Sequence, residues 1–283
     1  MEHANLAVRI LVPLFSIVIV ATILTARRRQ LFIRRIQGLT AIDEAIGRAT
    51  EMGRPMVCMT GLGQNGGIEI VTLQALSIVS YIIRNSARFG TRSIVPVFDP
   101  QMVPITEEAI RDAYAVEGRP EQYNPDDIRF LSNQQFAFAA SVAGMIWREK
   151  AAASFIFGYY YAESLIFAET GQQVGAIQVA GTPATTQIPF FIAACDYVII
   201  GDEYYAATAY LTRQPTLVGA IVGQDVVKGI LLAAILFGVL FYSFSALLYP
   251  HVHMPPVQNF FADKAVPLAD MLRPAAAAHG KGG

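Results

Sequence analysis

The chain has 283 residues, of which 54% are hydrophobic and only 15% are charged, and its mean hydropathy is +0.42. Soluble domains average about 25% charged residues, so this composition indicates that lipid solvates part of the chain. The formal net charge is −1, but the stretch from Ile36 to Asp225 holds nineteen acidic residues against ten arginines and one lysine. A domain with that balance lacks the basic face that nucleic-acid binding requires.

The first apolar segment, Ala7 to Ala26, has the length of a transmembrane helix and is interrupted only by Arg9. Arginines follow it at positions 27, 28, 29, 34 and 35. A cleavable signal peptide carries its positive charges before the apolar run, so we expect an uncleaved anchor over residues 1–26 and a basic juxtamembrane stem over residues 27–39. The positive-inside rule predicts that the arginines are cytoplasmic and the N-terminus is outside.

The region from residue 40 onward begins with a predicted helix and strand. A variant capping box, Thr40-x-x-Asp43, predicts the helix start, and Gly53 predicts its end. The apolar run Met56–Thr60 has strand length, and an apolar helix is expected from about Ile68 to Phe89. A helix without a polar face indicates burial on several sides, by a sheet and by a partner or lipid.

The turn between this strand and this helix, Gly61-Leu-Gly-Gln-Asn-Gly66, fits the G-x-G-x-x-G pattern of dinucleotide-binding sites. Glycines let backbone amides at a helix start approach a phosphate, so Gly61, Gly63 and Gly66 are candidate ligand-binding residues. The pattern is incomplete, because the acid that holds a ribose is expected about 20 residues further on. The nearest strand-end carboxylate is Asp99, which follows the predicted strand Ser93–Phe98. The alternative is a tight turn without a ligand.

Further strand patterns alternate with helical patterns up to residue 211. The predicted strands are Asp127–Leu131, Ala152–Phe157, Ala176–Ala180 and Asp196–Ile200. The helical patterns start near Thr106, Ser132, Glu163, Gly181 and Tyr204, and the apolar region Phe136–Trp147 is too short to span a membrane. This alternation, with strands apolar on both faces, predicts a doubly wound, mostly parallel, Rossmann-like α/β sheet flanked by two transmembrane helices.

The second long apolar segment runs from Val226 to Leu248, and no lysine or arginine follows it until Lys264. We therefore expect a transmembrane helix over residues 226–249, an extracytoplasmic tail over residues 250–283 and a cytoplasmic α/β domain over residues 40–225. The protein is predicted to be integral to a bacterial or archaeal cytoplasmic membrane, with both termini outside the cytoplasm.

Ligands of doubly wound sheets lie outside the carboxyl ends of the strands, so Gly181 and Thr182 complete the set of candidate binding residues. For Thr182, helix capping is the alternative. Cys58 and Cys195 lie in apolar, strand-like runs and are expected to be buried free thiols. The histidines are His3, His251, His253 and His279. None lies in the α/β domain, which therefore has no Ser-His-Asp triad, Cys-His pair or histidine metal site.

Outside the domain, His251-x-His253-Met254 has side chains that copper or haem iron binds, or it is an interfacial turn, and we assign no metal there. The sequence names no cofactor.

The stretch from Val179 to Glu203, together with the flanking apolar segments, resembles an uncharacterised family of prokaryotic membrane proteins that is defined only as a domain of unknown function. That resemblance implies no activity. The segment Ile192–Ile200 is also similar to a part of the crotonase and Clp-type protease fold, in which a helix after the oxyanion glycines leads into a strand. This chain has Gly181-Thr-Pro183 where those families have a glycine pair or Ser-Gly.

Three functions are therefore open. We expect an assembly or scaffold subunit of a membrane complex without visible catalytic machinery, with membrane lipid and either further copies of itself or other subunits as partners. The first alternative is a membrane-tethered nucleotide or cofactor sensor that uses Gly61–Gly67. The second is a crotonase-like or Clp-protease-like hydrolase that uses Gly181–Thr186.

Overall fold

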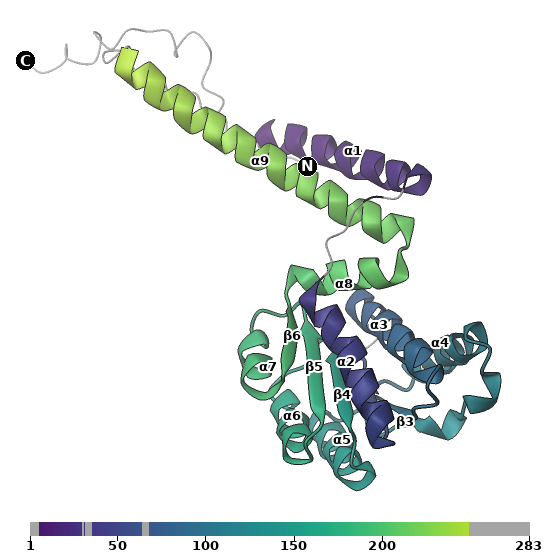
Figure 1. Cartoon of the computed structure of the whole chain (residues 1–283). Coiled ribbons are helices and arrows are strands. Elements are labelled where there is room, and N and C mark those ends of the chain that lie inside the picture. The colour runs from purple at the N-terminus through teal and green to yellow at the C-terminus, as the bar shows by residue number, and fades with distance from the viewer. Residues whose placement is uncertain (1–5, 30, 32–35, 64–67, 249–283) are drawn as a thin grey trace, which may run out of the picture. The chain divides into compact units, whose positions relative to one another are not determined.

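The computed structural model describes residues 6–29, 31, 36–63 and 68–248 (Figure 1). The chain divides into two compact units. The helical unit consists of Met1–Leu31 and Pro215–Gly283, and the α/β unit consists of Phe32–Gln214.

The α/β unit is built on six parallel strands in the order β3-β2-β1-β4-β5-β6. The strands are β1 (Met56–Met59), β2 (Ser93–Val97), β3 (Ile128–Phe130), β4 (Ala153–Phe157), β5 (Ile177–Thr182) and β6 (Tyr197–Ile200). Every residue of β1, β2, β4 and β5 is buried, as expected for strands covered on both faces. The predicted doubly wound α/β sheet is confirmed, and its strand order reverses between β1 and β4.

Helices cover both faces of this sheet (Figure 1). One core cluster joins the sheet to α2 (Gln37–Met52), α3 (Ile70–Ala87), α4 (Met102–Val116) and α8 (Asp202–Thr212). The other joins it to α5 (Gln135–Glu149), α6 (Ser164–Gln173) and α7 (Ile188–Ala194). Two short 3-10 helices, Pro120–Gln122 and Pro125–Asp127, precede β3.

Three predicted helix starts were wrong. The helix expected from Gly181 begins only at Ile188, because Gly181 and Thr182 are the last residues of β5. The helix α2 begins at Gln37, so Thr40 lies inside it and does not cap it, because buried Ile36 and Leu39 draw the first turn into the core. The helix α4 begins at Met102 rather than near Thr106, since Pro104 is tolerated in a first turn that needs no intrahelical N–H. Tertiary burial decided these starts, and the capping residues did not.

The apolar helix α3 is largely covered by its own unit. Ten of its eighteen residues are buried, and α4 and α8 pack against it. Exposed apolar side chains remain near its start, at Ile68, Ile70 and Leu73. Most of the apolar surface of α3 is therefore buried by the core of its own unit rather than by a partner or lipid.

Among the described residues, three helices are long and apolar enough to cross a membrane, over Ile10–Arg28, Ile70–Ala87 and Pro215–Phe241. The middle one is in α3, of which 61% is buried in the α/β unit, whereas the other two windows belong to α1 (Leu6–Arg28) and α9 (Pro215–Leu248). The helix α9 is continuous from Pro215, so the apolar segment predicted from Val226 is the later part of a longer helix.

The helices α1 and α9 pack closely through two glycines of α9. A Cβ at Gly219 would lie 2.5 Å from the Cα of Ile23, and a Cβ at Gly223 would lie 3.2 Å from the Cα of Ile19. The residues Gly219 and Gly223 form the small-xxx-small spacing that lets helix backbones approach each other. Four residues forward along α9 correspond to four residues backward along α1, so the two helices are antiparallel.

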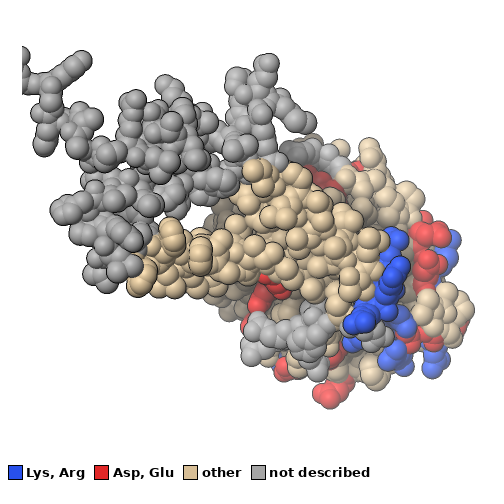
Figure 2. Space-filling model, turned by 90° about the horizontal axis from the view of Figure 1, so that it is seen from above, with Lys and Arg blue, Asp and Glu red and all other residues tan. Residues whose placement is uncertain are grey.

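Charged side chains of both signs lie intermixed on the face shown in Figure 2. A cluster of ion pairs joins α3 to the end of α4, where the guanidinium groups of Arg88 and Arg84 bind the carboxylate of Glu117 at 2.8 and 2.5 Å. These hydrogen bonds, Arg88 first, lower the pKa of Glu117 to about 2. A second cluster joins Arg92 and Arg129 to acidic residues around β3.

Candidate functional site

The turn after β1 is bonded to the turn after β4, at the point where the strand order reverses. The Gly61 N–H donates to the hydroxyl of Tyr160 at 2.9 Å, and the Leu62 N–H donates to the carbonyl of Tyr159 at 2.8 Å. The Tyr160 hydroxyl in turn donates to the carbonyl of Phe157 at 3.2 Å. A doubly wound sheet ordinarily holds its ligand between these two turns, and here the turns bind each other.

Glycines make this close approach feasible. At Gly61, with φ +89°, a Cβ would lie 2.9 Å from the backbone nitrogen of Tyr159. At Gly158, with φ +116°, a Cβ would lie 2.6 Å from the carbonyl oxygen of Thr60. Both positions combine a left-handed backbone with contacts to main-chain atoms that cannot move aside. The lack of a side chain at Gly61 therefore allows two segments of the chain to contact each other.

These contacts leave fewer backbone amides available to bind a phosphate at this turn. The amides of Gly61 and Leu62 already donate within the protein, so a phosphate can claim them only by displacing Tyr160 and Tyr159. The residue Gly63 also has a positive φ of +78°, as a tight turn requires. The third predicted glycine, Gly66, lies outside the described residues.

The other predicted site residues lie at the carboxyl edge, and each has a local structural role. The Asp99 carboxylate accepts from the Gln101 N–H at 2.8 Å and closes the turn into α4. The Thr182 hydroxyl, fully buried, accepts from the Ala184 N–H at 3.1 Å. At Gly181 a Cβ would lie 2.7 Å from the Phe157 ring. The capping interpretation of Thr182 was wrong, because Thr182 is the last residue of β5 and α7 begins only at Ile188. Its hydroxyl stabilises the turn after β5 instead.

A buried carboxylate, Glu163, lies just before α6 and was not among the predicted site residues. It has no exposed surface; Oε1 accepts from the Tyr161 N–H at 2.7 Å, and Oε2 accepts from the side-chain amide of Gln135. The neighbouring Tyr160 N–H donates to Oε1 of Gln187 at 2.9 Å. The sequence signal was an isolated acid between a strand and an apolar helix. Buried ionisable groups without an ionic partner are concentrated at functional sites, and no basic side chain in the described part of the chain pairs with Glu163.

Two tyrosines of the α/β unit, Tyr160 and Tyr204, are almost completely buried. Burial raises the pKa values of Tyr160 and Tyr204 well above 10. The Tyr204 hydroxyl donates to the carbonyl of Val71 at 2.8 Å, and the Tyr160 ring packs edge-on against Phe167 and Phe191. Both hydroxyls therefore stay protonated at neutral pH and act as hydrogen-bonding groups rather than as a base.

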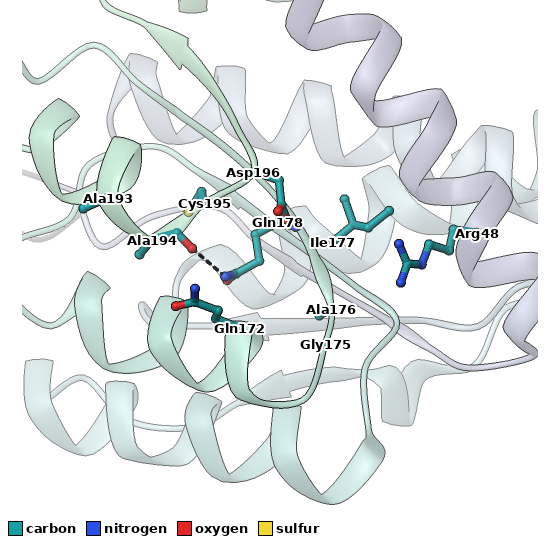
Figure 3. Close-up of a pocket in the computed structure, with 10 residues that line it drawn as sticks. All are labelled: Arg48, Gln172, Gly175, Ala176, Ile177, Gln178, Ala193, Ala194, Cys195 and Asp196. Atoms are coloured by element: carbon teal, nitrogen blue, oxygen red, sulfur yellow. Dashed lines mark hydrogen bonds between the residues drawn. The ribbon is translucent and has the colours of Figure 1, made fainter.

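A pocket of about 270 Å³ lies at the opposite, amino edge of the sheet (Figure 3). Arg48 of α2, Gln172 of α6 and the segments 175–178 and 193–196 line it. Figure 3 shows the side chain of Gln178 among these residues, with its amide donating to the carbonyl of Ala194 at 2.8 Å. The backbone N–H of Gln178 donates to the carboxylate of Asp196 at 2.8 Å. These contacts join β5 to β6, which gives the pocket walls a structural role.

The cysteines carry no activated thiol. Cys58 is buried as expected, whereas Cys195 is only partly buried, because it lies between α7 and β6 rather than inside a strand. Burial, with a smaller effect of Asp196, raises the pKa of Cys195 to about 12, and burial raises that of Cys58 further. A nucleophilic cysteine requires a lowered pKa. The described residues also contain no group of three or more His, Cys, Asp or Glu side chains arranged to hold a metal ion.

Comparison with known protein families gives a match over most of the chain. A family model described as "Domain of unknown function (DUF6754)" matches residues 1–252. No curated protein and no solved structure matches the chain. The match covers the helical unit up to residue 252 and the whole α/β unit, and it confirms the predicted resemblance to an uncharacterised family.

Proposed function

This chain belongs to the family described as "Domain of unknown function (DUF6754)", and from its structure we propose that it is a membrane-anchored assembly subunit. In this proposal α1 and α9 cross the cytoplasmic membrane, the α/β unit is cytoplasmic, and both termini are outside. The α/β unit then serves as a binding module for other subunits of a membrane complex.

One observation carries the proposal: the turns after β1 and β4 are bonded to each other. The Gly61 and Leu62 amides, which would otherwise face a ligand, donate to Tyr160 and Tyr159. A domain whose usual ligand position is occupied by its own turns is better suited to binding proteins through its surface than to binding a nucleotide.

The proposed topology rests on the charges and direction of the two helices. Arg27 and Arg28 end α1 and Arg29 follows it, and positive charges remain on the cytoplasmic side of a membrane helix. The antiparallel packing of α1 and α9 fits a hairpin that enters and leaves the bilayer from the same side.

The proposal is tested by co-purification and size. Full-length chains with two different tags are produced together, solubilised in a mild detergent and purified through one tag. We expect the second tag, or other subunits at fixed proportion, to co-purify. Chains produced separately and mixed after solubilisation are the matched control, because association by detergent would occur there too. A monomeric chain without partners, both in detergent and after cross-linking in membranes, would refute the proposal.

The topology is tested by labelling a cysteine introduced at Pro274. An impermeant thiol reagent should label Pro274→Cys in intact cells if the tail is outside. Cys195→Ser removes the partly buried native thiol from the background. Labelling only after permeabilisation would contradict the proposed orientation.

A second candidate, a ligand-binding sensor, is favoured by the buried carboxylate of Glu163. A thermal-shift screen with NAD, NADP, ATP, GTP, flavins and coenzyme A derivatives tests it, since a ligand at 100 times its Kd stabilises a protein by about 2.7 kcal/mol. A ligand that stabilises the wild type but not Glu163→Gln would favour the sensor. The matched control is Glu169→Gln, a change in the following helix.

A further inference from the structure

The strand β6 forms one edge of the sheet and, among the described residues, pairs only with β5. The Gly201 N–H, just after β6, donates to the carbonyl of Thr182 in β5 at 3.0 Å. Alternate residues of a parallel strand bond to the same neighbour, so Ile199 bonds to β5 as Gly201 does. The N–H and C=O groups of Val198 and Ile200 therefore point outward from the edge of the sheet.

The two edges of the sheet differ in their protection against a further strand. The other edge strand, β3, has three residues, and its Arg129 forms ion pairs with Asp127 and Glu149 at 3.9 and 3.5 Å. Charged side chains and short length are common means of preventing a sheet edge from pairing with another strand. The strand β6 has the sequence Tyr-Val-Ile-Ile, without a charge or a proline. Its edge is therefore the one that accepts a further strand.

Apolar side chains beside this edge are exposed. Ile200 exposes 42% of its surface, and Phe190 and Ile192 of α7 expose 39% and 58%. Val198 packs into the core cluster on the α7 face, and the side chain of Ile200, two residues further along the strand, points to the same face. A strand added at this edge would cover apolar surface in addition to pairing the outward backbone groups.

We propose that β6 pairs in antiparallel fashion with β6 of a second copy of this chain, so that two six-stranded sheets join into one. A twofold axis at Ile199 places Val198 of each copy opposite Ile200 of the partner subunit. Opposite residues of a hydrogen-bonded antiparallel pair exchange both N–H···O bonds. This register therefore uses every outward group of Val198 and Ile200, in four bonds between the copies. The inference rests on the proposed function and names the partner.

The attachment of the chain to its membrane helices favours this arrangement. The helix α2 follows the connection from α1, and α8 precedes α9. Both belong to the same core cluster and lie on one face of the sheet. The twofold axis of two sheets joined edge to edge by antiparallel strands is perpendicular to the joined sheet, so it leaves the α2 and α8 faces of both copies on the same side. Two chains anchored in one membrane require this.

A proline at position 198 tests the pairing without breaking the ladder to β5. The N–H of Val198 points outward, so Val198→Pro removes a bond between copies and leaves the bonds to β5. We expect co-purification of two differently tagged full-length chains to be lost for Val198→Pro. The matched control Val198→Ala shortens the side chain but keeps the N–H, and it should retain co-purification. Far-UV circular dichroism checks the fold of both variants, and equal co-purification of the two overturns the pairing.

Cross-linking in native membranes tests the register and needs no proline. Ile199 lies opposite Ile199 of the partner subunit in a pair without hydrogen bonds, where the Cα atoms are about 4.5 Å apart, a spacing that fits a disulfide. Ile199→Cys in a Cys195→Ser background should therefore form a disulfide between copies on mild oxidation. The matched control is Tyr197→Cys on the same face. Its two copies would lie about 13 Å apart along the strands, too far for a disulfide.

The outcomes separate this interface from the proposed function. Cross-linking of Ile199→Cys without cross-linking of Tyr197→Cys supports the pairing, and it decides the question if Val198→Pro does not fold. Equal cross-linking at both positions, or none at Ile199→Cys, overturns the pairing. If wild-type copies or other subunits co-purify while Ile199→Cys does not cross-link, the assembly function stands and this interface is wrong. If the wild type is monomeric and without partners throughout, both fail.

Discussion

Replacing Tyr160 with phenylalanine tests whether the contact between the β1 and β4 turns stabilises the α/β unit. The change keeps the ring, whose centroid lies 5.4 Å from that of Phe167 and 6.0 Å from that of Phe191, and removes only the hydroxyl. That hydroxyl accepts from the Gly61 N–H at 2.9 Å and donates to the carbonyl of Phe157 at 3.2 Å. Tyr160→Phe therefore isolates two hydrogen bonds from the apolar packing around them.

The expected loss is about 2 kcal/mol in the free energy of unfolding. A donor left unpaired away from water costs about 1–3 kcal/mol, and the longer bond to the carbonyl of Phe157 adds little, because a carbonyl has a second lone pair. Urea unfolding of the full chain in mild detergent, followed by far-UV circular dichroism, measures the change. The control is Tyr197→Phe, whose hydroxyl donates to Glu44 on the surface at 3.2 Å and should contribute less than about 0.5 kcal/mol. Equal unfolding midpoints for Tyr160→Phe and the wild type would refute the role given to this hydroxyl.

Other predictions follow from single contacts. Glu163→Ala should destabilise the α/β unit by about 2 kcal/mol in the same assay, because two donors lose their acceptor, while Glu163→Gln keeps an acceptor and should lose less. Gly219→Leu should lower the melting temperature in detergent by forcing α1 from α9, whereas Gly238→Leu, which meets open space, should not. The lowered pKa of Glu117 makes its stabilising contribution complete above about pH 4.5 and lost as the pH falls toward about 2, so Glu117→Gln should flatten the acid dependence of stability. Cys195, with a pKa of about 12, should react with Ellman's reagent far more slowly at pH 8 than glutathione does.

The sheet could be predicted from sequence because its strands are short apolar runs between helices. The runs Met56–Thr60, Ala152–Phe157 and Asp196–Ile200 each contain a strand of the structure, displaced by one residue or less at most ends. Helix starts were harder, since a buried residue such as Ile36 can begin a helix ahead of a better capping residue. Local patterns therefore predicted the order of the elements better than their ends.

The site could be predicted only in part, because its contacts connect residues distant in the chain. The pattern Gly61-x-Gly63 is visible locally, but the acceptor of the Gly61 N–H is a hydroxyl ninety-nine residues further on. The role of Glu163 could not be predicted either, since one of its hydrogen-bond donors is Gln135 in another helix. A glycine pattern indicates that other atoms approach the backbone closely, but it does not identify those atoms. Only the fold shows that they belong to Tyr159 and Tyr160.

The same distinction applies to the membrane segments, and there it changes the chemistry. Composition identifies Ala7–Ala26 and Val226–Leu248 as apolar, and taken separately each fits a bilayer with Lys228 at an edge. The register between α1 and α9 is a tertiary property, fixed by Gly219 and Gly223, and it offsets the centres of these two segments by about eleven residues. Two helices that pack side by side share one bilayer, so their segments cannot both be centred in it. In the proposed topology the helix with the arginine block is the costlier one to displace, and this choice moves the start of the segment Val226–Leu248 away from the cytoplasmic interface.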